Sequence, residues 1–193
     1  MKIVCLLGSP RRDGNSATIA KRFIETATSL GAEIRTFELN RLNYRGCQGC
    51  CACKTARDIC VQKDDLTEVL TAIREKEADI YLLAFPVYGG TVPGQVKCFT
   101  DRCFSFMIPD YVGHPQPSRV PPGKKGVLIV TQGAVEEKYT EATEQQQVRM
   151  KHQWRLDEVH IIRACNVGPG GVPKGVPDNY LQQAEDVARA LIT

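Results

Sequence analysis

The sequence lacks a long apolar run, and this absence limits where the protein can work. No stretch approaches the roughly 18 to 20 consecutive apolar residues that a membrane span needs. The first apolar run has only five residues, between Lys2 and Gly8, which is too short for the core of a signal peptide. Apolar residues make up 42% of the chain and charged residues 24%, close to the globular average. We therefore expect a soluble, cytoplasmic protein without a membrane partner.

The chain also has no block of charge and few of the common catalytic signatures. Its 25 basic and 22 acidic residues are scattered, so nucleic acid is not an expected partner. It lacks the Gly-Lys-Ser/Thr end of a triphosphate-binding loop, the three spaced glycines of a dinucleotide-binding fold and the Gly-x-Ser-x-Gly elbow of hydrolases. The three histidines, His114, His152 and His160, stand apart from one another. We expect them to be structural or solvated, and we predict no catalytic acid or base.

What is present is an alternation of apolar runs and amphipathic segments. The periodicity predicts strands at 2–7, 34–39, 80–85, 127–130 and 159–164, and helices at 19–27, 64–73, 95–106, 135–154 and 179–192. Two of these strands, 80–85 and 127–130, are continuously apolar, which is typical of strands covered by helices on both faces. The order predicts a single doubly wound α/β domain over residues 1–193, with ligands beyond the carboxyl ends of its strands.

The loop after the first predicted strand suits a phosphate. Residues 8–16 place hydroxyls, an amide, backbone N–H groups and two guanidinium groups at the start of a helix, where an anion is favoured. A plain helix cap with solvated arginines is the alternative. The sequences Gly8-Ser-Pro-Arg and Gly14-Asn-Ser resemble the phosphate loop of the NAD(P)H-dependent FMN reductases. The resemblance implies a flavodoxin-like parallel sheet of order 2-1-3-4-5 with helices on both faces, and it implies FMN with its phosphate held by Ser9, Arg11, Asn15 and Ser16.

Two further loops follow the central strands. Residues 85–93 contain an aromatic residue and two glycines, so a flat ligand could lie against them, although an ordinary strand-to-helix turn fits equally well. This segment resembles the Pro-x-Tyr loop of the same family, and residues 131–134 resemble its second ring-contacting loop. The proline-rich segment 109–123 has no match. The resemblance implies that the flavin ring contacts Pro86, Val87, Tyr88, Gly89, Gly90, Thr131, Gln132 and Gly133.

Five of the nine cysteines fall within one predicted long loop, residues 44–63. The spacing Cys47-x2-Cys50-x2-Cys53-x6-Cys60 favours a soft metal or an iron-sulfur cluster. Zinc sites more often use two separated knuckles, and free thiols without metal are the other alternative. The spacing resembles the compact motif of the iron-sulfur flavoproteins, a subgroup of the same family. That resemblance implies a 4Fe-4S cluster bound by Cys47, Cys50, Cys53 and Cys60.

The remaining cysteines need separate interpretations. Cys51 lies beside two of the implied ligands and is expected not to bind iron. It could, however, compete for iron or act as a spare redox-active thiol. The other four, Cys5, Cys98, Cys103 and Cys165, lie in or beside apolar segments and are expected to be buried and inert.

Together with these patterns, the resemblance implies an FMN-dependent oxidoreductase that passes electrons between FMN and the cluster. NAD(P)H is the candidate electron donor, and a small molecule or a protein is the expected exchange partner. One alternative is a plain FMN or quinone reductase without a cluster, and another is a thiol-based redox-sensing or metal-binding module. We expect a homodimer or homotetramer.

Overall fold

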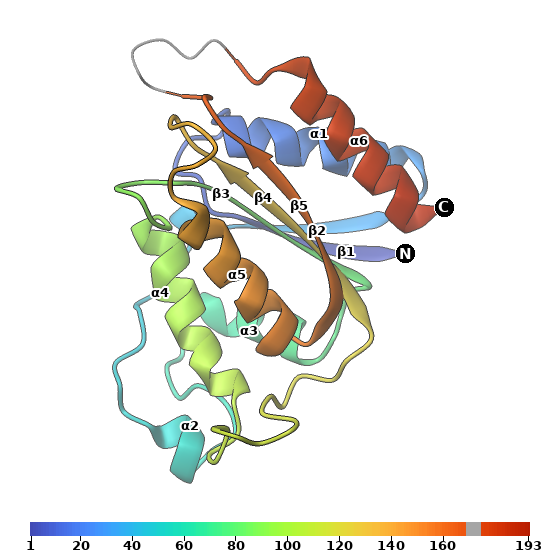
Figure 1. The fold of residues 1–193 in the computed structure, drawn as a ribbon. Helices are drawn as coiled ribbons and strands as arrows, with labels where there is room; N and C mark the ends of the chain where they lie inside the picture. Colours follow the sequence, from blue (N-terminus) through green and yellow to red (C-terminus); the bar gives the residue numbers. More distant parts are fainter. Residues whose placement is uncertain (169–174) are drawn as a thin grey trace.

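One five-stranded parallel sheet forms the centre of the structure, a computed structural model that describes residues 1–168 and 175–193 (Figure 1). Its order is β2-β1-β3-β4-β5, which confirms the predicted arrangement. All four neighbouring pairs are parallel, so every strand ends at the same edge of the sheet. The strands are β1 (Lys2–Leu7), β2 (Glu33–Glu38), β3 (Ile80–Pro86), β4 (Lys124–Thr131) and β5 (Leu156–Ala164).

Helices cover both faces of this sheet (Figure 1). One face carries α1 (Asn15–Ser29) and α6 (Asp178–Ile192), and the other carries α3 (Leu66–Arg74), α4 (Gly94–Arg102) and α5 (Thr140–His152). Three short elements complete the set: α2 (Ala52–Thr55) and the 3-10 turns η1 (Leu39–Arg41) and η2 (Cys103–Phe106). Within the described residues, no helix is both long and apolar enough to cross a membrane.

Two hydrophobic cores lie on opposite faces of the sheet because successive side chains of a strand alternate. In β3, Leu82 packs into the core beneath α1 and α6, whereas Leu83 packs into the core beneath α3, α4 and α5. Every residue of β3 is buried, as its continuous apolar run predicts. Trp154 is 1% exposed and meets the Phe99 ring edge-on, so it belongs to the second core.

Two predicted helices are shorter than their patterns suggest. The segment 135–154 becomes helical only at Thr140, because the carbonyls of Val135 and Lys138 accept hydrogen bonds from the Gln132 side chain at 2.7 and 2.8 Å. The segment 95–106 is α-helical only to Arg102 and continues as the 3-10 turn η2. Strands β4 and β5 in turn begin three residues earlier than predicted.

Candidate functional site

Backbone hydrogen bonds join the loops that follow β1, β3, β4 and β5. The N–H of Gly8, after β1, donates to the carbonyl of Ala84 in β3 at 2.7 Å. The N–H of Val87 donates to Thr131 at 2.8 Å, which connects the ends of β3 and β4. The N–H of Gln132 donates to Ala164 at the end of β5 at 2.9 Å. The carboxyl ends of these strands therefore form one continuous rim.

A hollow of about 200 Å³ opens in this rim. Eleven of the twelve residues predicted to contact FMN line it, and Gly90 is the exception. Val167 and Gly168, which follow β5, also line it and were not predicted. The complete lining is Ser9, Arg11, Asn15, Ser16, Pro86, Val87, Tyr88, Gly89, Thr131, Gln132, Gly133, Val167 and Gly168.

One end of the hollow has the chemistry of an anion site. Helix α1 begins there at Asn15, and in the described structure no side chain caps its first N–H groups. The Ser16 side chain is 1% exposed, yet its hydroxyl has no hydrogen-bond partner among the described residues. Unpaired buried hydroxyls are costly, and helix N-termini favour negative charge. Together with the exposed Arg11 side chain, these groups fit a phosphate.

The other end of the hollow is shaped by a two-residue turn. Gly89 and Gly90 have φ angles of +56° and +81°, and Tyr88 and Thr91 close the turn with hydrogen bonds in both directions. A side chain at Gly90 would point at the Tyr139 ring, 3.0 Å away, which explains why Gly90 lies outside the lining. The Tyr88 side chain is 42% exposed, so its ring surface is open to a planar ligand.

The side chain of Gln132 is engaged by the protein itself. It is 2% exposed, its Nε2 donates to the carbonyls described above, and its Oε1 accepts from Arg163 at 3.2 Å. Its structural role is thus to hold the loop that leads into α5. The missed residues Val167 and Gly168 had a signal in the sequence, because Gly168 follows the fifth strand just as the predicted loops follow the others.

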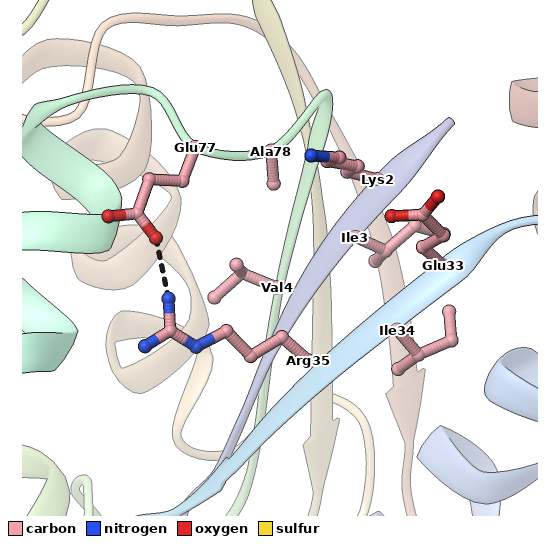
Figure 2. A pocket seen from close by; sticks show the side chains of 8 residues that line it. All are labelled: Lys2, Ile3, Val4, Glu33, Ile34, Arg35, Glu77 and Ala78. Atoms are coloured by element: carbon pink, nitrogen blue, oxygen red, sulfur yellow. Dashed lines mark hydrogen bonds and ion pairs between the residues drawn. The ribbon is translucent and has the colours of Figure 1, made fainter.

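A larger hollow, of about 440 Å³, lies at the opposite edge of the sheet (Figure 2). It is lined by Lys2, Ile3, Val4, Glu33, Ile34, Arg35, Glu77 and Ala78. Figure 2 shows that Arg35 points to Glu77, with which it forms an ion pair at 2.5 Å. Arg35 also pairs with Glu68. Because the charge of Arg35 is already paired and parallel sheets bind ligands at the carboxyl ends of strands, we assign no function to this hollow.

The cysteine segment, residues 44–63, forms its own small hollow of about 30 Å³. All four predicted ligands and Cys51 line it. No three His, Cys, Asp or Glu side chains of the described residues converge as they would around one metal ion. A cluster is wider than one ion, and five soft sulfur donors around one hollow have the chemistry that iron-sulfur clusters require.

Cationic side chains fasten this segment to η2 and Met107 and to the proline-rich segment 109–123, which the sequence left unmatched. Arg119 donates to the carbonyl of Cys53 at 3.2 Å and to that of Met107 at 2.6 Å. Lys54, in α2, donates to the carbonyls of Phe104 and Met107 at 2.6 Å and lies 4.0 Å from the centre of the Phe104 ring. The proline-rich segment therefore supports the cysteines.

Of the four cysteines outside the cysteine segment, three are buried and one is partly exposed. Cys5, Cys103 and Cys165 are buried as predicted, and burial raises the pKa of Cys5 and Cys103 to about 12. The prediction is wrong for Cys98, which is partly exposed. Its side chain faces Gly46, whose missing Cβ would lie 3.3 Å from the sulfur. Because glycine has no side chain, it cannot cover this thiol fully.

The five-stranded parallel sheet of order 2-1-3-4-5, with helices on both faces, defines a class of protein, the flavodoxin-like α/β fold. The sequence profile described as NADPH-dependent FMN reductase matches residues 1–153. The chain belongs to this family.

Two curated relatives are named iron-sulfur flavoprotein. One, from Archaeoglobus fulgidus, is 31% identical over 187 residues, which cover 97% of this chain and 77% of the relative. The other, from Methanosarcina thermophila, is 36% identical over 102 residues, which cover 53% of this chain and 52% of the relative. The match thus spans about half the length of this second relative.

Solved structures support the same fold. An FMN-dependent NADH-azoreductase from Bacillus anthracis superimposes with a TM-score of 0.76 at 17% identity, over all of both chains. An NAD(P)H:quinone oxidoreductase from Methanothermobacter marburgensis superimposes with a TM-score of 0.69 at 18% identity, over all of this chain and 94% of the other.

Proposed function

We propose that residues 1–193 form a single domain that binds FMN and a 4Fe-4S cluster and passes electrons between them. The FMN-binding part of this proposal rests on one observation, the hollow of about 200 Å³ where the three predicted loops meet. Membership of the FMN reductase family supports this half, and the name of the Archaeoglobus fulgidus relative supports the cluster.

Within the proposed site, the phosphate of FMN lies against the N-terminus of α1. The Ser16 hydroxyl and the first N–H groups of the helix donate to it, and Arg11 offsets part of its charge. Asn15 and Ser9 complete the contacts, Ser9 through its backbone because its hydroxyl donates to the Arg11 carbonyl. A charge-assisted hydrogen bond of this kind contributes about 1.5 to 3 kcal/mol.

The flavin ring lies against Tyr88 and the Gly89-Gly90 turn, with residues 131–133 along another side. Because the Gln132 amide is engaged by the protein, this loop contacts the ring through its backbone. Bound FMN would supply the conversion of a two-electron donor into single-electron transfer. The chain's own residues bind and orient the ring, and NAD(P)H is the proposed donor.

The cluster ligands are Cys47, Cys50, Cys53 and Cys60, whereas Cys51 stays free. One observation favours a second candidate, an FMN or quinone reductase without a cluster: no three metal-ligating side chains converge in the part of the chain that the structure describes. The two candidates differ in bound iron.

The decisive experiment is anaerobic purification from cells supplied with iron, followed by three measurements. Mass spectrometry identifies the molecule released by denaturation, which we expect to be FMN. Iron and acid-labile sulfide are each expected at about four per chain. FMN without iron supports the second candidate, whereas a larger flavin or none contradicts the flavin site.

We also expect a homodimer or homotetramer, which light scattering tests.

A further inference from the structure

A buried arginine lies beneath the cysteine segment. Arg102, the last residue of α4, is 1% exposed and lines the cysteine hollow together with Cys60. Burying a guanidinium group is costly unless its charge and its N–H donors find partners. The partners of Arg102 therefore show what it holds in place.

The acceptors of Arg102 lie on both sides of the cysteine motif. Its Nη1 donates to the carbonyl of Arg45 at 3.0 Å and to Asp64 Oδ2 at 2.8 Å. Its Nη2 donates to the carbonyl of Gln62 at 3.3 Å and to Asp64 Oδ1 at 3.2 Å. One acceptor precedes the first cysteine of the motif by two residues, and the others follow the last by two and four. Arg102 thus joins the two ends of the segment.

One donor of this arginine is left over. A guanidinium group has five N–H donors, and the bonds above use four of them. The fifth, Nε–H, is buried and has no acceptor among the described residues. A buried cationic donor beside thiols suits a sulfur acceptor.

We infer that Arg102 is a positioning residue for the cluster, which closes the cysteine segment and donates its Nε–H to a cluster sulfur near Cys60. This inference rests on the proposed cluster. Reduction adds negative charge to a cluster, so a nearby cation and a hydrogen bond to sulfur favour the reduced state. Arg102 therefore raises the reduction potential of the cluster and slows its loss of iron.

The test compares two conservative variants of the anaerobically loaded protein. Arg102→Lys keeps the charge but loses the Nε–H and the planar fork. The matched control is Arg74→Lys, because Arg74 pairs with Asp58 of the same segment at 2.7 Å, in an ion pair whose aspartate is exposed. The measurements are the cluster's reduction potential and its rate of iron release to a chelator. For Arg102→Lys we expect a more negative potential and release at least about tenfold faster, with Arg74→Lys unchanged.

Two additions keep the test decisive if Arg102→Lys folds poorly. The double variant Asp64→Asn with Arg102→Gln replaces the ion pair by a neutral hydrogen-bonding pair, and its FMN content and thermal unfolding report on the fold. In the wild type, labelling with 15N-arginine should produce a nitrogen coupling in pulsed electron paramagnetic resonance of the reduced cluster.

The outcomes separate the inference from the proposed function. A wild-type potential in the folded Arg102 variants, or the absence of 15N coupling, overturns the role of Arg102 while the cluster stands. Faster iron release with an unchanged potential also overturns the hydrogen bond to sulfur. A wild-type protein that takes up no iron and sulfide overturns the cluster itself, and the inference with it.

Discussion

The Ser9 hydroxyl accepts a hydrogen bond from the backbone N–H of Arg11 at 3.1 Å and donates one to the Arg11 carbonyl at 2.9 Å. Gly14 packs on the same hydroxyl, since a Cβ there would lie 2.7 Å from Ser9 Oγ. The turn before α1 is therefore closed without a ligand. A preorganised loop loses little conformational entropy when it binds an anion.

Arg11→Ala should weaken FMN binding by about 1.5 to 3 kcal/mol, because it removes a charged hydrogen bond to the phosphate. Titration of the apoprotein with FMN, followed by flavin fluorescence, measures the change. The control is Arg12→Ala, since Arg12 is exposed and does not line the hollow. If Arg11→Ala binds FMN as tightly as the wild type, Arg11 does not belong to the site.

Ser16→Ala should affect the apoprotein and the complex in opposite directions. The Ser16 hydroxyl is buried and has no partner among the described residues, so its removal should leave the apoprotein equally or more stable. Binding of FMN should weaken, because the phosphate loses a donor. Thermal unfolding with and without FMN measures both effects, and a variant that FMN stabilises as strongly as the wild type would contradict this assignment.

Gly89→Val and Gly90→Val should lower the FMN content. Both positions have positive φ angles, which valine adopts only with strain, and a side chain at Gly90 would also crowd Tyr139. The matched control is Gly31→Val, with φ +87° and open space around it. It should destabilise the fold yet retain FMN. Flavin absorbance per chain is the measurement, and full occupancy in both site variants would place the ring elsewhere.

Serine at Cys47, Cys50, Cys53 or Cys60 should reduce bound iron well below about four atoms per chain, because each thiolate supplies one corner of the cluster. FMN should remain, since its loops are separate from the cysteine hollow. Cys51→Ser is the control and should keep both cofactors. Iron analysis and the visible spectrum measure the result, and full iron loading in the four variants would refute the ligand assignment.

Trp154→Ala should lower the free energy of unfolding by about 3 to 5 kcal/mol. The indole is buried and its ring centre lies 5.7 Å from that of Phe99, so truncation leaves a cavity in the core beneath α4 and α5. Urea unfolding measures the loss. Val148→Ala is the control, because that side chain is 54% exposed on α5 and should change stability little. A loss below 1 kcal/mol in Trp154→Ala would contradict this packing.

The sequence was most informative where a pattern is local. The continuous apolar run of β3 predicts a strand covered on both faces, and the loops after the strands could be placed because parallel strands share an edge. The hydrogen-bond partners of individual side chains could not be predicted from the sequence. Arg102 resembles a surface residue in the sequence, since arginines are seldom buried, and its partner Asp64 lies 38 residues away. The late start of α5 likewise depends on the Gln132 side chain, whose bonds no periodicity reveals.

The hydrogen bond from Arg119 to the Cys53 carbonyl spans 66 residues. During synthesis the four cysteines of the motif therefore leave the ribosome long before the segment that supports them. A nascent chain presents these thiols on an unsupported loop, open to oxidation and to competing metals. The hydrogen bond that Arg119 supplies to the cysteine segment therefore cannot form until the ribosome has added 66 residues beyond Cys53.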